Sequence, residues 1–88
     1  MKLKIDKSFE KDTNNINNTK LLIKVAVCIE NVLAAETIND INNIKKLTGF
    51  KYHYRIRIGD YRAGIVIKNN EVIFERLIHR KDIYKYFP

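Results

Sequence analysis

The sequence predicts an α+β domain in which two N-terminal helices pack on one face of a small antiparallel β-sheet. Apolar residues recur at helical spacing in the N-terminal half, whereas the C-terminal half alternates between apolar and polar residues in three short runs. Residue pairs that favour tight turns, Gly59-Asp60 and Asn69-Asn70, separate these runs. A chain of 88 residues suits one small domain, residues 1–88, with a single core.

The N-terminal part is expected to form a strand followed by two helices. Residues 2–6 alternate as a short strand, and Ser8 can cap a short polar helix that the asparagines of residues 14–18 then end. From residue 19 to 35 the apolar positions follow one face of a helix, which is the natural cover for the apolar face of the sheet. Those positions are Leu22, Val25, Ala26, Ile29, Val32 and Leu33.

The remaining elements follow in order. Residues 36–50 carry apolar residues three apart, which suit either a helical extension or a loop held by apolar anchors, and we favour a mostly irregular connection. The alternating runs then give strands at about 52–58, 61–68 and 71–78. Residues 80–87 form a short basic and aromatic helix or turn. The face of the sheet away from the helices is left open to a ligand.

Two arginines are expected to face each other across the first hairpin. With a two-residue turn at Gly59-Asp60, Arg57 pairs directly with Arg62. Like charges opposite each other destabilise a sheet unless an anion lies over them. The hairpin therefore predicts a positive site of the size of a phosphate.

The second hairpin extends this register to the last strand. A type I′ turn between the second and third runs places Arg62 opposite Leu77 and Gly64 opposite Glu75. The other face is then an apolar core wall with Arg76 as its one misfit. A slip by one residue would exchange the two faces. The charged face collects Arg55, Arg57, Arg62, Glu75 and His79.

The composition restricts the class of protein. Lys and Arg total 17 against 10 Asp and Glu, and the formal charge of +7 favours nucleic acid, an anionic membrane or an acidic protein as a partner. The lone Cys28 lies in an apolar helical run, which indicates a buried thiol in a reducing cytoplasm. We expect no signal peptide, membrane span or structural zinc site, because the sequence lacks a long apolar run, a second cysteine and a spaced histidine pair.

Three motifs at this spacing resemble a known family. They are Leu47-Thr48-Gly49, the run YRIRIGDYR from Tyr54 to Arg62, and HRKDIY from His79 to Tyr84. Together they resemble the RelE/ParE toxins of bacterial type II toxin–antitoxin systems over nearly the full chain. The resemblance implies a sheet with two N-terminal helices on one face and a concave basic face on the other. RelE-like members cut mRNA without a metal or other cofactor, commonly in the ribosomal A site, whereas ParE-like members poison DNA gyrase.

Metal-free RNA cleavage sets the chemistry that such a site has to supply. The ribose 2′-hydroxyl attacks the adjacent phosphorus, so the site must help remove its proton, stabilise a more negative phosphorane and protonate the leaving 5′-oxygen. By resemblance, Arg62 clamps the scissile phosphate, with a solvated strand arginine as the alternative. Arg80 contacts phosphate by the same resemblance. Tyr84 stacks on a base or hydrogen-bonds near the 2′-hydroxyl, or else is an aromatic residue at the edge of the core.

Arg55 and Arg57 stand where some relatives carry lysines, and arginine can hardly act as a base because its pKa stays above about 12. Proton transfer therefore passes to His79, whose ordinary pKa of about 6.5 suits it, unless this histidine only ends a strand. Glu75 either orients an arginine, serves as a base or forms a cross-strand salt bridge with Arg55. Lys81 is read as a sequence-independent phosphate contact. The same reading applies to Lys45, Lys46, Lys51 and Lys85.

These residues favour an mRNA endoribonuclease toxin that acts on the 70S ribosome in the cytoplasm. The alternatives are a gyrase-poisoning toxin without catalysis and an inactive member that only binds its antitoxin and regulates its own operon. The expected partners are mRNA, the ribosome and an acidic antitoxin encoded next to the toxin, which would form a hetero-oligomeric complex. No cofactor and no membrane partner are expected.

Overall fold

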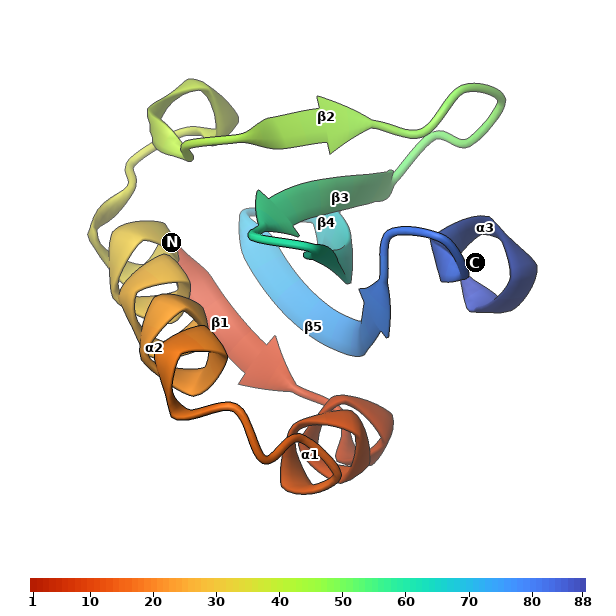
Figure 1. The fold of residues 1–88 in the computed structure, drawn as a ribbon. Helices are drawn as coiled ribbons and strands as arrows, with labels where there is room; N and C mark the ends of the chain where they lie inside the picture. Colours follow the sequence, from red (N-terminus) through yellow and green to blue (C-terminus); the bar gives the residue numbers. More distant parts are fainter.

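The computed structural model describes residues 1–88 and contains a five-stranded sheet with helices on both faces (Figure 1). The strand order is β1-β5-β4-β3-β2, and all neighbours are antiparallel except β1 and β5, which are parallel. The predicted α+β class is therefore confirmed. In chain order the elements are β1 (Lys2–Ile5), α1 (Lys7–Asn14), α2 (Thr19–Ala34), a 3₁₀ turn (Ile38–Asp40), β2 (Ile44–Lys46), β3 (His53–Ile58), β4 (Tyr61–Lys68), β5 (Glu71–His79) and α3 (Ile83–Tyr86).

The long helix α2 forms where its periodicity predicts it. The Asn18 side chain caps it by accepting a hydrogen bond from the Leu21 amide at 3.1 Å. The buried stripe is rotated relative to the prediction, because Leu21 is buried whereas Ala26 and Leu33 are exposed. Two further apolar residues of α2, Ile23 and Val27, are also exposed. The helix therefore keeps an apolar surface that the core does not use.

The short helix α1 closes the edge of β5 beyond the end of β1. Ser8, which was expected to cap this helix, instead donates to the Glu75 carbonyl at 2.6 Å. The Asp12 carboxylate accepts from the Leu77 amide at 2.9 Å and from Arg76 Nε at 2.8 Å. Side chains of α1 thus form the hydrogen bonds with the main chain of β5 that a neighbouring strand would otherwise form. The Arg76 guanidinium pairs with Asp12 outside the core.

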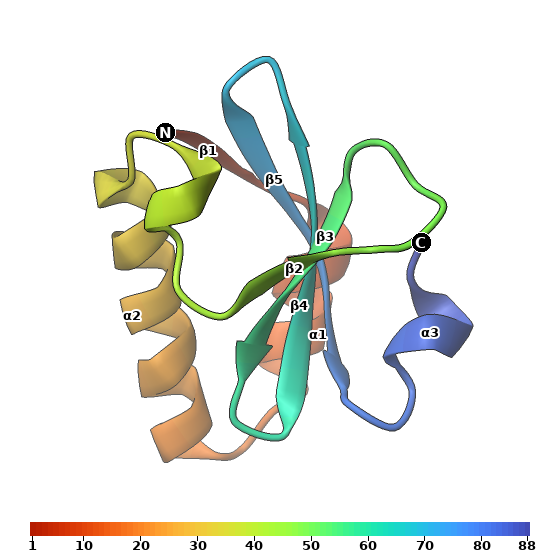
Figure 2. The ribbon, with the colours of Figure 1, turned by 90° about the horizontal axis from the view of Figure 1, so that it is seen from above.

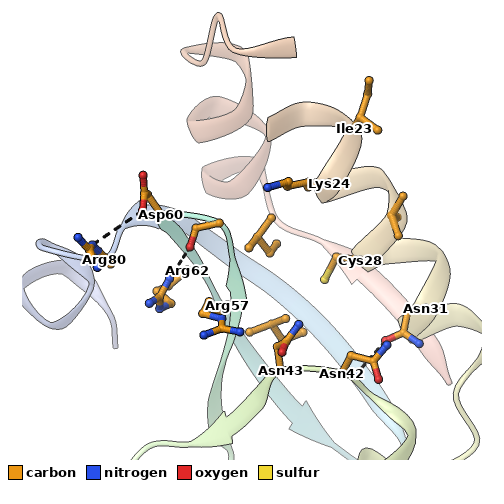
Figure 3. A pocket seen from close by; sticks show the side chains of 14 residues that line it. Ile23, Lys24, Cys28, Asn31, Asn42, Asn43, Arg57, Asp60, Arg62 and Arg80 are labelled. Atoms are coloured by element: carbon orange, nitrogen blue, oxygen red, sulfur yellow. Dashed lines mark hydrogen bonds and ion pairs between the residues drawn. The ribbon is translucent and has the colours of Figure 1, made fainter. Parts of the chain in front are cut away.

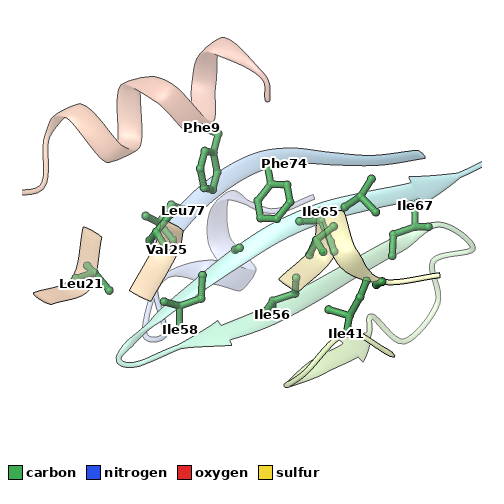
Figure 4. Packing of buried hydrophobic residues seen from close by; sticks show 14 residues of the cluster. Phe9, Leu21, Val25, Ile41, Ile56, Ile58, Ile65, Ile67, Phe74 and Leu77 are labelled. Carbon is green, nitrogen blue, oxygen red and sulfur yellow. The ribbon is translucent and has the colours of Figure 1, made fainter. Parts of the chain in front are cut away.

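The main core lies between the sheet and the two N-terminal helices (Figure 4). The Phe9 ring of α1 packs edge-on against Phe74 of β5, with ring centroids 5.3 Å apart. Val25 and Val32 of α2 reach the same cluster, and the strands contribute alternate residues such as Ile65. The two N-terminal helices therefore share one apolar layer with the sheet, as predicted.

Both hairpin turns have two residues, but a β-bulge breaks the predicted register of β5. Asn69 and Asn70 both have positive φ, as a type I′ turn requires. The pairing runs as predicted up to Phe74 and then shifts, so that Gly64 lies opposite Arg76 instead of Glu75. Arg62 consequently faces Ile78 instead of Leu77, and the prediction is wrong from that point onward.

The face of the sheet opposite α2 is partly covered, whereas the sequence suggested that it is open. Figure 2 shows α3 on this face, across the sheet from α2. Leu47, Ile78, Ile83 and Phe87 form a second, smaller buried cluster here. The connection of residues 36–50 also contains the short strand β2, where an irregular segment was expected. Only part of this face is therefore free to bind a ligand.

The C-terminal segment is fixed to the sheet by a close approach of Phe87 to Gly64. A Cβ atom at Gly64 would lie only 2.6–2.7 Å from carbons of the Phe87 ring, so the ring needs a glycine beneath it. We expect Gly64→Ala to lower the free energy of unfolding by about 1–3 kcal/mol, because the ring has to move away.

A double-mutant cycle of denaturant unfolding checks this expectation. In a Phe87→Ala background the added methyl group meets no ring, so Gly64→Ala should cost little there. Equal costs in both backgrounds would contradict the proposed contact.

Candidate functional site

Three arginines from separate elements meet on the face of the sheet that carries α3. Arg55 comes from β3, Arg62 from β4 and Arg80 from the turn after β5. They line one hollow of about 350 Å³, which we call the arginine hollow. It brings together most of the residues that the sequence singled out. Its lining consists of Arg55, Arg62, Arg80, Lys81, Ile83 and Tyr84.

Arg62 is held by the main chain of its own hairpin. One terminal guanidinium nitrogen donates to the carbonyl oxygens of Gly59 at 3.0 Å and Tyr61 at 2.9 Å. The other N–H groups of this side chain make no hydrogen bond within the protein and can donate to an anion. The hairpin turn therefore orients the guanidinium before any ligand arrives.

The electrostatic surroundings of Arg62 are strongly positive. Arg57 lies directly opposite Arg62 in the strand register, as predicted. Partial burial lowers the pKa of Arg62 from its ordinary value, and the charges of Arg55, Arg57 and Arg80 lower it further. Bringing like charges together costs free energy, which a bound phosphate would offset.

A groove of about 720 Å³ runs between α2 and the β3–β4 turn (Figure 3). Arg57, Arg62 and Arg80 lie on the side of the groove opposite α2, so Arg62 and Arg80 line both this groove and the arginine hollow. Cys28 also lines the groove and is only partly buried, whereas a buried thiol was expected. Burial nevertheless raises the pKa of the Cys28 thiol to about 11, which keeps it protonated near neutral pH.

Asp60 is a positioning residue that the sequence did not single out. Its carbonyl oxygen accepts a hydrogen bond from the Arg80 amide at 2.8 Å, and its carboxylate lies 4.0 Å from Arg80 Nε. The contact joins the β3–β4 turn to the segment after β5. Nothing local in a Gly-Asp turn reveals this role, because the partner lies twenty residues further along the chain.

His79 does not share a face with Arg62, and that expectation is wrong. The β-bulge places His79 opposite Tyr61, with ring centroids 5.4 Å apart, and the two rings line a different hollow next to α1. His79 Nδ1 accepts a hydrogen bond from the Lys81 amide at 3.2 Å.

Glu75 is also absent from the arginine hollow and forms no salt bridge with Arg55. It occupies the bulge itself. Burial raises the pKa of its carboxyl group, and the nearby charge of Asp6 raises it further.

Comparison with known proteins decides the family. No family model matches the sequence. The toxin RelE3 of Methanocaldococcus jannaschii is 38% identical over 89 residues, covering 100% of both chains. The chain belongs to the RelE toxin family.

Solved structures agree with this assignment. The RelB–RelE antitoxin–toxin complex of Methanococcus jannaschii contains a chain that is 35% identical, with a TM-score of 0.81 over 97% of this chain and 99% of that one. The RelE–RelB complex of Pyrococcus horikoshii gives a TM-score of 0.72 at 19% identity over 90% and 93%, which shows the shared fold. The resemblance to RelE proteins is therefore confirmed, and the protein is a toxin of a toxin–antitoxin system.

This RelE-family toxin has neither a helix suited to a membrane nor a cluster of metal-binding side chains. None of its helices has the length and apolar character needed to cross a membrane. No group of three or more His, Cys, Asp or Glu side chains is arranged to hold a metal ion.

The positive field at Arg62 predicts stabilisation of this RelE-family toxin by small anions. Inorganic phosphate should raise the unfolding midpoint of the parent protein, because it binds the folded state. Arg62→Ala should reduce this shift, while its own stability in phosphate-free buffer should stay within about 1 kcal/mol of the parent, since the lost carbonyl contacts and the relieved repulsion offset each other. Lys20→Ala removes an exposed cation of α2 and serves as the control. An equal phosphate shift in all three proteins would contradict an anion site at Arg62.

Proposed function

We propose that this toxin is an endoribonuclease that cuts mRNA on the 70S ribosome, with no metal taking part. The observation that supports the proposal is the meeting of Arg55, Arg62 and Arg80 beside Tyr84 in a hollow that no carboxylate lines. Guanidinium groups bind two phosphate oxygens at once and stabilise negative charge that develops in the transition state.

The proposed reaction uses the RNA as its own nucleophile. The 2′-oxygen forms a bond to the adjacent phosphorus, the bond from phosphorus to the 5′-oxygen breaks, and the products are a 2′,3′-cyclic phosphate and a 5′-hydroxyl. One proton leaves the 2′-hydroxyl and one is given to the 5′-oxygen, so the charge balance needs no further reactant. Arg62 clamps the scissile phosphate, and Arg55, Arg80 and Lys81 stabilise the phosphorane. Arg57 lies opposite Arg62, outside the arginine hollow, and adds to the positive potential at the phosphate.

The group that moves the proton has to lie in the arginine hollow. Tyr84 lines this hollow, is 66% exposed and is near enough to Arg62 to affect the pKa of that arginine. His79 was the general acid expected from the sequence, but its ring contacts Tyr61 outside this hollow. We therefore assign proton transfer to Tyr84 ahead of His79. Glu75 has no contact that supports a part in the reaction.

Single-turnover cleavage of ribosome-bound mRNA tests this assignment. Tyr84→Phe keeps the ring and removes only the hydroxyl, so we expect it to slow cleavage by about 10²–10⁴-fold. His79→Gln should slow it by less than about 10-fold. The opposite pattern would return the role to His79. A parent protein that leaves mRNA intact but blocks gyrase supercoiling would replace the whole proposal with the gyrase hypothesis.

We also propose that a cognate acidic antitoxin binds the groove beside α2. Related RelE chains were solved in complexes with RelB antitoxins. The groove combines the exposed apolar side chains of Ile23 and Val27 with the cations Lys24 and Arg57. An antitoxin segment with apolar and acidic residues fits both parts, and it would contact the same Arg62 that we assign to RNA.

Two substitutions on α2 test this docking surface. Val27 is 59% exposed and lines the groove, whereas Leu33 is 54% exposed and does not. Val27→Asp should weaken antitoxin binding by about 10-fold or more, because it buries a carboxylate against an acidic partner, and Leu33→Asp should have little effect. Cleavage of mRNA should remain parental in both. Equal affinity of the two variants for the antitoxin would contradict docking in the groove.

A further inference from the structure

The arginine hollow continues into a second hollow beside β2. This β2 hollow has a volume of about 380 Å³ and lies between β2, the loop after it and the C-terminal segment. Arg55 and Tyr84 line both hollows, so the two are joined. A third hollow over the loop of residues 47–51 shares Phe50 and Lys46 with the second. The β2 hollow is lined by Lys45, Lys46, Leu47, Thr48, Phe50, Arg55, Tyr84, Phe87 and Pro88.

The charged side chains that line these three hollows are all positive. No Asp or Glu lines any of them, whereas Asp60 lines the α2 groove and Asp12 and Asp82 line the hollow that holds His79. A polyanion can therefore follow this surface from end to end without meeting an acidic side chain. The cations along it are Arg62, Arg80, Lys81, Arg55, Lys45, Lys46 and Lys51.

Aromatic rings accompany these cations. Phe50 lines two of these hollows, with Lys46 in both and Lys51 in one, and its side chain is 45% exposed. Its ring packs edge-on against the His53 ring, with ring centroids 5.4 Å apart. The ring centroid of His53 in turn lies 5.6 Å from that of Phe87, whose side chain is buried against the sheet. The Phe50 amide also donates to the Leu47 carbonyl at 3.3 Å. Phe50 is thus an exposed ring on a supported loop, which is the arrangement that stacks nucleic-acid bases.

We propose that the β2 hollow binds the nucleotide of single-stranded RNA next to the scissile phosphate, with the Phe50 ring as a stacking platform for its base. Lys45 and Lys46 would contact the phosphates on that side. The hollow lies within the size range of small-ligand sites, and Tyr84 stands at the junction between the two nucleotides. The substrate has to be unpaired here, because bases stacked inside an A-form duplex cannot reach a protein ring. This inference rests on the proposed ribonuclease function and names the form of RNA that the site accepts.

Binding of short RNAs that cannot be cleaved tests the inference. The probes are oligonucleotides of two to about six residues in which 2′-deoxyribose removes the nucleophile. We expect affinity to rise with length, because longer probes reach Phe50. Phe50→Ala should weaken binding of the longest probe by about 10-fold, while Phe50→Trp, which keeps a stacking ring, should bind like the parent. Leu33→Ala removes an apolar side chain of α2 that is 54% exposed and is the control.

The lysine contacts are tested by the salt dependence of the same binding. Lys46→Gln should reduce the slope of log affinity against log salt by about 0.7, which corresponds to one phosphate contact on a single strand. Lys20→Gln, on α2, should leave the slope unchanged.

Each outcome distinguishes this inference from the function on which it rests. A parent protein that neither binds nor cuts RNA would remove both. A parent that cuts mRNA and binds the longest probe no better than its Phe50→Ala and Lys46→Gln variants would overturn only the β2 hollow. Loss of antitoxin affinity in Phe50→Ala with unchanged RNA affinity would assign this surface to the antitoxin and overturn the inference.

Discussion

The β-bulge at Glu75 determines how the last long strand serves two separate cores. Val72 and Phe74 point into the core beneath the N-terminal helices, and strict alternation would send Arg76 there as well. A lone guanidinium in that layer would be costly, because a buried charge needs a partner. The extra residue shifts the alternation, so that Leu77 fills the main core and Ile78 the second one. Arg76 instead reaches the Asp12 carboxylate of α1.

The candidate site depends on the second core that the bulge makes available. The segment after β5 supplies Arg80, Lys81 and Tyr84 to the arginine hollow, and its position is fixed by Ile83 and by Phe87 over Gly64. Asp60 adds a link to the hairpin that holds Arg62. These contacts hold the guanidinium groups close together although their charges repel one another. Packing supplies the free energy that holds this arrangement until an anion offsets the repulsion.

The two faces of this RelE-family toxin differ in chemistry but meet at the same arginines. The α2 groove combines apolar residues with side chains of both charges, whereas the hollows on the other face carry cations and no acidic side chain. Arg62 and Arg80 line both surfaces. A protein partner in the groove and an RNA in the arginine hollow would therefore compete for the same guanidinium groups. Competition of this kind would give a simple physical basis for neutralising such a toxin without covering the whole of the surface that we propose for RNA.

The sequence by itself determined the features that depend on nearby residues. The period of α2, the two-residue turns and the pairing of Arg57 with Arg62 all follow from local patterns, and the structure contains each of them. The motif resemblance also identified the family, because those motifs combine turn chemistry with charged residues at a set spacing.

Only the tertiary structure decided the position of His79, the packing of α3 on the sheet face opposite α2 and the parallel pairing of β1 with β5. A bulge shifts the register by one residue, and the two residues that follow it here donate hydrogen bonds to Asp12, more than sixty residues earlier in the chain. Local periodicity carries no information about such a partner. For the same reason the sequence could not predict the contact between Asp60 and Arg80 or the joined hollows beside β2, because both form between segments that are distant in the chain.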